Sequence, residues 1–385
     1  MSFDLVQPIR ANIAILKYLG LWRFDNKWDP IYRLYSFVLH FCFTILTTAS
    51  MWASVFTSNE FETITESLHM ALTEAVFLPK IINMLRLSNE SVHFLTLFDT
   101  DEFNLKNSEE LNLFKSAHGI FYRVVKCYCS SAVGVYAACF TVVAIGKNFV
   151  LPYPAWMPFD LHSKFYWYAY FFQLIGLTVT TLSHVSIDVL QLFLLRHISL
   201  IYHVIGMRFA KIGFDLDNNL TNPSEIHKSV MKDMREIVKI HRFVKKVTNK
   251  CENFMSFPFF MQVLLSALVL CFSGYQTSSI SPRENPGQFL AMGDFLVVIG
   301  IQMFLPCYYG NQVTVESGKI SEALYNSNWI VLPETSKKVI FLYMEFLKEP
   351  VSVKAGKFFD IGLPVFGKTI NNAYSYFALL LQMNN

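Results

Sequence analysis

Long apolar stretches alternate with polar connections along the whole chain. Seven of these stretches contain about 20 residues or more, the length that an α-helix needs to cross a lipid bilayer. The pattern therefore predicts an all-α, polytopic membrane protein with seven transmembrane helices. The expected spans lie at residues 34–55, 64–85, 124–145, 165–195, 254–275, 289–309 and 358–383.

Two of the polar connections carry helical patterns of their own. Near the N-terminus, Ile9, Ile13 and Leu16 recur at helical spacing, which predicts a helix that lies on the membrane surface without crossing it. Asn222 followed by Pro223 is a typical helix start. Apolar residues at helical spacing follow it, so we expect one helix that continues into the fifth span.

A further short amphipathic helix is predicted just before the last span, at residues 336–348. Val339, Tyr343 and Phe346 would share one side of it, and Pro350 would end it. This helix belongs to the same polar part of the chain as the connection after the sixth span.

Composition agrees with a membrane protein and excludes several other classes. The chain has 385 residues, of which 53% are hydrophobic and 16% charged, whereas soluble domains are about a quarter charged. Lys and Arg are scattered, with no basic cluster of the kind that binds nucleic acid. No nucleotide, metal or hydrolase motif is present, so we expect neither an enzyme nor a cofactor, and the seven Cys resemble small buried apolar residues.

The distribution of Lys and Arg predicts the orientation in the membrane. Of the 32 basic residues, 27 lie in the segments 1–33, 86–126, 196–250 and 314–357, and only 3 lie in the alternate loops. Basic loops stay on the cytoplasmic side. We therefore expect a cytoplasmic N-terminus and an extracellular C-terminus, the opposite of a G-protein-coupled receptor.

The last span carries a polar stripe. Lys368, Asn371, Ser375 and Gln382 fall on one helical face, together with Leu379. Such a face either hydrogen-bonds to a neighbouring helix or lines water in a pore or cavity. Both interpretations are open from the pattern alone.

The same stretch resembles the C-terminal signature of insect odorant receptors. The resemblance is carried by residues 375–383, SYFALLLQM, and by Pro350, Gly356 and Lys357 before them, and the Leu19–Trp22 segment resembles the family's N-terminal region. The family implies a tetrameric ligand-gated cation channel in the plasma membrane of sensory neurons, opened by a small volatile odorant. An obligate co-receptor shares the tetramer, and the last helix of each subunit lines the pore.

Carried over onto this chain, the resemblance assigns a pore face and a subunit type. Leu379, Gln382 and Met383 resemble the gate and filter region, and Lys368, Asn371 and Ser375 continue the pore face inward. The long loop that the co-receptor has between spans four and five is absent, so the chain resembles a ligand-tuning subunit. The implied organisation is an amphipathic segment at 1–33, spans one to four with the ligand pocket at 34–195, a cytoplasmic loop at 196–253, spans five and six at 254–313, a cytoplasmic anchor at 314–357 and the pore helix at 358–385.

Spans three and four are candidates for the ligand site because their outer parts carry no charge. Small residues on one helix opposite aromatic residues on the next leave room for a small neutral ligand, although ordinary bundle packing produces the same pattern. The resemblance places the pocket in the outer half of spans two, three, four and six. The candidate lining residues are His69, Met70, Ser131, Gly134, Tyr136, Phe140, Phe171, Phe172, Ile175 and Met292.

Several ionisable residues lie at membrane depth. Glu74, Asp188 and Asp294 are carboxylates within the spans, where a charge is costly. They either mark an ion path or pair inside the bundle. His184 and Asp188 are four residues apart, so they share a helical face, and we expect a structural hydrogen bond there.

Two other functions compete with the odorant receptor hypothesis. A gustatory-type channel of the same superfamily would bind a taste compound and act without a co-receptor. A small-molecule transporter is a different class, and the broken helices and internal repeats typical of transporters do not occur in the sequence.

Overall fold

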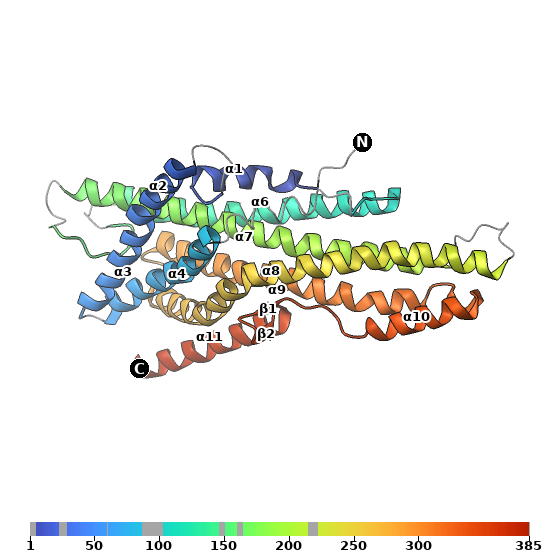
Figure 1. Ribbon diagram of the computed structural model, residues 1–385. Helices are drawn as coiled ribbons and strands as arrows, with labels where there is room; N and C mark the ends of the chain where they lie inside the picture. Colours follow the sequence, from blue (N-terminus) through green and yellow to red (C-terminus); the bar gives the residue numbers. More distant parts are fainter. Residues whose placement is uncertain are drawn as a thin grey trace.

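The computed structural model describes residues 5–22, 29–59, 61–86, 103–145, 151–159, 165–214 and 222–384, which form an elongated bundle of α-helices (Figure 1). The helices are α1 (Arg10–Tyr18), α2 (Asp29–His40), α3 (Leu46–Thr57), α4 (Phe61–Arg86), α6 (Ser108–Ile145), α7 (Tyr166–Ala210), α8 (Pro223–Ser279), α9 (Pro286–Tyr325), α10 (Glu334–Phe346) and α11 (Leu363–Asn384). Short turns of 3₁₀ helix, η1 (Gln7–Ile9) and η3 (Trp329–Val331), and of π-helix, η2 (Phe41–Ile45), join some of them. Two short strands, β1 (Lys354–Ala355) and β2 (Phe359–Asp360), pair antiparallel.

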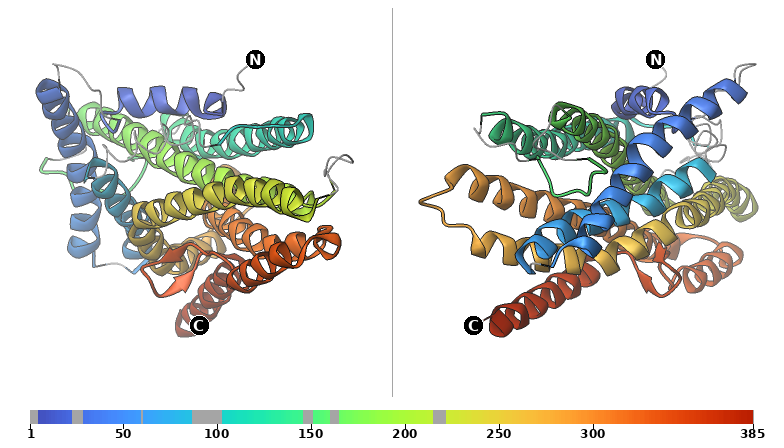
Figure 2. Two further views of the ribbon diagram at one scale, coloured as in Figure 1. Left: turned by 45° about the vertical axis from the view of Figure 1, so that its right-hand side comes forward. Right: turned by 90° about the vertical axis from the view of Figure 1, so that its left-hand side faces the viewer.

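Three helices run most of the length of the molecule. Helices α7, α8 and α9 form its centre, with α6 beside α7 and α11 beside α8 and α9 (Figures 1 and 2). The first helices, α2 to α4, lie at one end, and α10 lies at the other. Within the described residues, five segments are long and apolar enough to cross a membrane: α2 to α3, most of α4, α7, α8 and α9. Helices α6 and α11 occupy the positions of the other two expected spans.

The structure confirms the helix start at Asn222. The side-chain oxygen of Asn222 accepts a hydrogen bond from the backbone N–H of Ser224 at 3.1 Å, which caps α8. Helix α8 then continues without a break for 57 residues. The expected apolar stripe is also confirmed, since Val230, Met234 and Val244 are buried.

The N-terminal helix is docked on the bundle. Ile9 and Leu16 are fully buried in the main core, and the side-chain amide of Asn12 donates a hydrogen bond to the backbone oxygen of Ser186 in α7 at 2.9 Å. The apolar stripe of this segment therefore packs on protein, whereas the sequence pattern alone had pointed to the membrane surface.

Helix α10 forms where it was expected. Ser336 and Ile340 are buried, whereas Val339 and Phe346 are exposed and Tyr343 is half-buried. Val339, Tyr343 and Phe346 do share one side of the helix as predicted, since Val339 and Tyr343 line one groove and the Tyr343 and Phe346 rings stack. The fully buried residues, however, are Ser336 and Ile340. Packing against α8 and α9 selects a face that the spacing of large residues does not identify.

The last helix begins later than the apolar stretch does. Gly356 and Lys357, with φ of 57° and 65°, form the turn between β1 and β2, a conformation that Gly favours. Helix α11 starts only at Leu363. The junction approaches α9 closely, because a Cβ atom at Gly310 would lie 2.5 Å from the backbone oxygen of Ile361.

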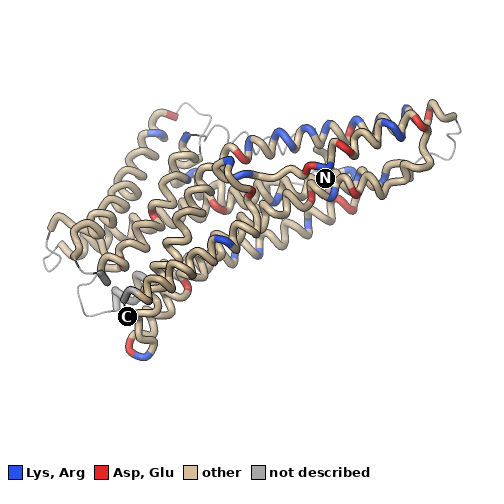
Figure 3. Tube along the Cα trace, turned by 90° about the horizontal axis from the view of Figure 1, so that it is seen from below, with Lys and Arg blue, Asp and Glu red and all other residues tan. Residues whose placement is uncertain are grey.

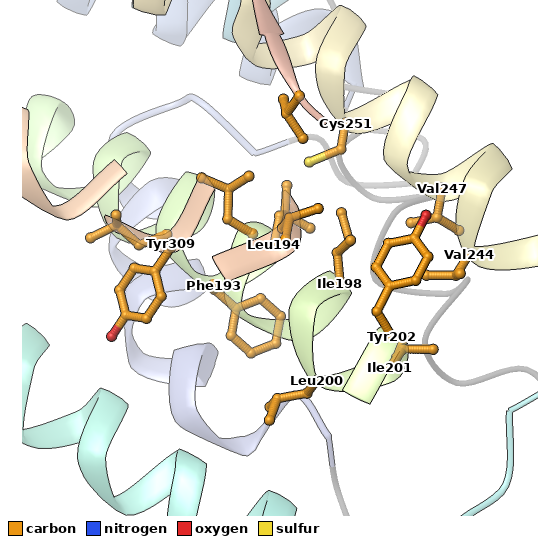
Figure 4. Packing of buried hydrophobic residues seen from close by; sticks show 14 of the residues in the cluster. Phe193, Leu194, Ile198, Leu200, Ile201, Tyr202, Val244, Val247, Cys251 and Tyr309 are labelled. Atoms are coloured by element: carbon orange, nitrogen blue, oxygen red, sulfur yellow. The ribbon is translucent and has the colours of Figure 1, made fainter. Parts of the chain in front are cut away.

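The main core of buried apolar side chains extends along the long helices toward the end of the molecule that holds α10. Figure 4 shows Phe193, Leu194 and Tyr202 of α7 packed toward Val247 of α8 and Tyr309 of α9. All five side chains are almost completely buried. The charged residues gather at this same end of the long helices, while the other end carries few (Figure 3).

Candidate functional site

A cavity of about 100 Å³ lies among α4, α6, α7 and α9. Half of its lining is apolar: Met70, Ala132, Val135, Leu177, Val185, Phe295, Val298 and Ile299. The other half can form hydrogen bonds: Thr73, Glu74, Tyr128, Tyr136, Thr180, Thr181, His184 and Gln302. Apolar walls that also carry hydrogen-bonding groups are typical of a small-molecule site.

One end of the cavity is closed by a buried ion pair. The Lys80 ammonium of α4 bonds to Asp188 of α7, and both side chains are almost completely buried. The Lys80 ammonium also lies 2.9 Å from Nε2 of His184. Tyr128 of α6 and Gln302 of α9 donate to Asp188 Oδ2 at 3.1 and 2.8 Å. One carboxylate therefore ties four helices together.

This network extends what the sequence predicted. The structure brings His184 and Asp188 near each other, but the 3.7 Å between Nε2 and Oδ2 is too long for the expected hydrogen bond. His184 Nε2 instead lies 2.9 Å from Lys80 Nζ and 2.6 Å from Gln302 Nε2. The partners Tyr128 and Gln302 were missed. The sequence did not identify these two residues because Tyr and Gln are common within membrane spans. Only the fold shows which carboxylate each of them faces.

Two of the ten predicted pocket residues line the cavity. These are Met70 of α4 and Tyr136 of α6. The Tyr136 hydroxyl group lies 2.6 Å from the Thr178 hydroxyl group and 3.3 Å from the backbone oxygen of Leu174, so the ring is held in place across the α6–α7 contact.

Three predicted residues pack next to the cavity lining, and a fourth, Phe172, packs on the first helices instead. His69 lies edge-on to Phe295, with ring centres 5.6 Å apart, and Met292 belongs to the same cluster. Phe140 contacts the Tyr136 ring at 4.9 Å. Phe172 packs against Phe43 of η2 at 6.3 Å.

The other four predicted residues point elsewhere. Ser131 is half-buried on a side of α6 different from Tyr128 and Ala132, and Gly134 is exposed beside Asp294 of α9. Phe171 and Ile175 of α7 are 52% and 45% exposed. None of these four is among the residues that surround the cavity in the described part of the chain.

Helix α11 has one face packed on the bundle and one face that is exposed among the described residues. Thr369 and Ala373 are buried, and Phe377, four residues further, contacts Gly274 of α8. The predicted pore residues lie on the other side. Lys368, Asn371, Ser375, Leu379 and Gln382 are all exposed, whereas the side chain of Met383 is outside the described part.

Ion pairs hold the end of the bundle that carries α10. Arg208 of α7 donates two hydrogen bonds to Glu110 of α6, at 2.8 and 2.9 Å. Burial opposes ionisation of Glu110, but the Arg208 hydrogen bonds outweigh it and the pKa of Glu110 is lowered. His203 of α7 lies 2.6 Å from a Glu316 oxygen of α9. These contacts fix the long helices to one another far from the cavity.

Comparison with known proteins gives consistent relatives over almost the full length. The family model described as "7tm Odorant receptor" matches residues 60–374. Odorant receptor 94a of Drosophila melanogaster is 33% identical over 392 residues, covering 99% of both chains. Odorant receptor 46a, isoform B, of the same organism is 24% identical over 385 residues, covering 98% of each.

The fold also matches a solved structure. The insect olfactory receptor OR5 of Machilis hrabei, in complex with eugenol, superposes with a TM-score of 0.86 at 15% identity, covering 99% of this chain and 100% of that one. The expected all-α fold with seven transmembrane helices is thereby confirmed. The chain belongs to the 7tm odorant receptor family, as a multi-pass membrane receptor that is neither the co-receptor nor an enzyme.

Proposed function

We propose that this odorant receptor is the ligand-tuning subunit of a cation channel that it forms with the co-receptor in the plasma membrane of sensory neurons. The observation that carries the proposal is the cavity among α4, α6, α7 and α9. In a receptor of this family, these are the helices that the resemblance assigns to the pocket. The predicted orientation, with a cytoplasmic N-terminus, is part of the same proposal.

The ligand is a small, neutral and mostly apolar volatile. The cavity of about 100 Å³ is smaller than the roughly 300–1,000 Å³ of sites for drug-sized ligands. Met70 and Tyr136 contact the ligand, while His69, Phe140 and Met292 support the residues around it. The relative from Machilis hrabei was solved in complex with eugenol, which supports a small organic ligand here.

The exposed face of α11 supports a pore. A polar face that is exposed among the described residues suits water or a second subunit. We assign Leu379, Gln382 and Met383 to the gate and filter, and Lys368, Asn371 and Ser375 to the wider inner part of the pore. An apolar ring such as one formed by Leu379 stops ions by excluding water until the helices separate.

A paired recording tests the function. Cells that express this chain with the co-receptor should give a cation current when an odorant panel is applied, and cells that express it alone should not. Tyr136→Ala should change the ranking of odorants, because Tyr136 is part of the cavity wall. Phe171→Ala is the matched control, since Phe171 is exposed on the next helix and lies outside the lining.

Each alternative function has its own result in this recording. Odorant-evoked current from the chain alone would indicate a gustatory-type channel. Substrate uptake without a current would indicate a transporter. If Tyr136→Ala and Phe171→Ala change the ranking equally, the ligand does not occupy this cavity.

A further inference from the structure

Glu74 is a carboxylate in the cavity wall with an unused hydrogen-bonding atom. The residue is 7% exposed and lines the cavity. Its Oε2 atom is buried and has no hydrogen-bond partner among the described residues. The neighbour that hydrogen-bonds the carboxyl group is Thr180 of α7, whose hydroxyl group also lies 3.3 Å from the backbone oxygen of Leu177. One hydroxyl proton cannot satisfy both acceptors.

The other carboxylate at the cavity shows what a structural role looks like. Asp188 receives Lys80 on one oxygen and Tyr128 and Gln302 on the other. Buried polar groups are almost always paired in this way, because an unpaired one is costly in an apolar setting. Glu74 departs from that rule at the point where a ligand would sit.

The polar groups around Glu74 indicate which kind of ligand would complete it. The hydroxyl of Tyr128 and the amide of Gln302 already donate to Asp188, and the Thr73 hydroxyl donates to the backbone oxygen of His69. Tyr136 has its own partners across the α6–α7 contact. Among the buried side-chain atoms without a partner in the described part of the chain, the one that belongs to the cavity lining is Glu74 Oε2, an acceptor, and a ligand that brings a donor would complete it.

We propose that Glu74 determines the specificity of the cavity by accepting a hydrogen bond from the hydroxyl group of a small alcohol or phenol. Met70, Leu177 and Val298 hold the hydrocarbon part of that ligand. This inference rests on the proposed function, because it takes the cavity as the odorant site. An ether or ester brings only acceptor atoms and would leave Oε2 unpaired.

A protonated amine is disfavoured because it must lose its hydration to enter the cavity. Asp188, the other carboxylate near the cavity, is already paired with Lys80 and is not free to balance the charge of an amine. A neutral hydroxyl group satisfies Glu74 without adding a second positive charge.

Binding to the purified full-length receptor tests the proposal without relying on channel activity. The probes are pentyl, cyclohexyl and benzyl compounds, each as the alcohol, the methyl ether and the primary amine. Affinity is taken from the ligand-induced rise in melting temperature. The wild-type receptor should bind the best alcohol roughly tenfold to a hundredfold more tightly than its methyl ether, because leaving a buried acceptor unpaired costs about 1–3 kcal/mol.

Variants at Glu74 should remove this preference in steps. Glu74→Leu should bind the alcohol and the ether equally, and Glu74→Gln, which keeps a neutral acceptor, should show a reduced preference. Asp294→Asn is the matched control, because Asp294 is a carboxylate within a span that does not line the cavity. It should keep the full preference.

The wild-type comparison decides the question even if Glu74→Leu fails to fold. Equal binding of the alcohol and the ether by the wild type, or tighter binding of the amine, overturns the proposal. The proposal is also overturned if both Glu74→Gln and Glu74→Leu keep the full preference for the alcohol over the ether. Current recordings with the co-receptor present distinguish a failure of the proposed channel function from a failure of the assignment of Glu74. A missing current with an intact binding preference contradicts the channel function and supports the assignment of Glu74.

Discussion

The two halves of α7 show how one helix serves two different purposes. From Ser186 to Leu195 every residue is buried, and the core continues with little interruption to Phe209. From Tyr166 to Val185, buried residues alternate with exposed ones such as Trp167. The cavity lining on α7 ends at Val185, directly before the fully buried run begins.

The difference arises from how each half is surrounded. The half after Ser186 lies within the main core, and two of its charged side chains pair inside the bundle, Asp188 with Lys80 and Arg208 with Glu110. The half before it carries hydroxyl and amide groups on the inner side and aromatic residues on the outer side. The fully buried half, called the rigid half below, thus stabilises the receptor, whereas the other half leaves space for a ligand.

The ion pair of Lys80 and Asp188 lies at the boundary between the halves, so breaking it should have the largest effect. Lys80→Met would leave the Asp188 carboxylate buried without its cation. We expect a loss of about 3–5 kcal/mol in the free energy of unfolding. Thermal unfolding of the purified receptor, followed by size-exclusion chromatography, measures it.

A double variant and an exposed pair serve as controls for this prediction. Lys80→Met with Asp188→Leu removes both charges and should recover much of the loss. Lys211 and Glu109 form an exposed pair, with side chains 43% and 63% exposed, so Lys211→Met should cost less than about 1 kcal/mol. A double variant less stable than Lys80→Met alone would contradict the argument.

Acidification should weaken the rigid half through His241 of α8. Burial, and then the nearby Lys245, lowers the pKa of His241 to about 4 from 6.5. Between these values the unfolded state binds more protons than the folded state, so stability falls as the pH falls from 6.5 to about 4 and then levels off. The loss amounts to roughly 3 kcal/mol at most.

Unfolding temperatures measured between pH 7 and pH 4 check this contribution. His241→Gln should have a shallower decline than the wild type. Tyr343→Phe removes a hydroxyl group 2.7 Å from His241 Nδ1 but keeps the burial, so it should retain the wild-type slope. A slope that vanishes in Tyr343→Phe and persists in His241→Gln would show that burial of His241 is not the cause.

The sequence predicts the rigid parts of the fold better than the cavity. The cap at Asn222 and the stripe at Val230 and Met234 were identified because the start of α8 is polar on its outer side. Hydrophobic periodicity then reveals the buried face. The late start of α11 was missed because Phe358 and Phe359 at the end of the hairpin, and Ile361 after it, continue the apolar run of the helix that follows.

The cavity residues are harder to predict for a physical reason. In a membrane span the outward side also faces an apolar medium, so hydrophobicity does not distinguish it from the buried side. From the sequence, Phe171 and Ile175 were therefore as plausible as cavity-lining residues as Leu177, which does line the cavity. The rotation of α6 likewise directs Ala132 inward and Ser131 elsewhere, and only the packing against α7 and α9 fixes it.

The smallest expected effect comes from an Ile→Val substitution made at each of three positions. Ile205 is fully buried in the rigid half of α7, Ile175 is exposed in the other half, and Ile299 of α9 lines the cavity. Ile205→Val should cost about 0.5–1.5 kcal/mol, because the closely packed neighbours cannot fill the lost methyl group. Ile175→Val should change stability by less than about 0.5 kcal/mol.

Ile299→Val should separate stability from ligand binding. Its lost methyl group borders a space that already exists, so the cost should fall below that of Ile205→Val, while the enlarged cavity should favour longer odorants. Unfolding temperature and odorant ranking of the three variants test both points. If Ile205→Val shifts the ranking as much as Ile299→Val does, the dense half of α7 also shapes the ligand site, and the two halves do not act independently.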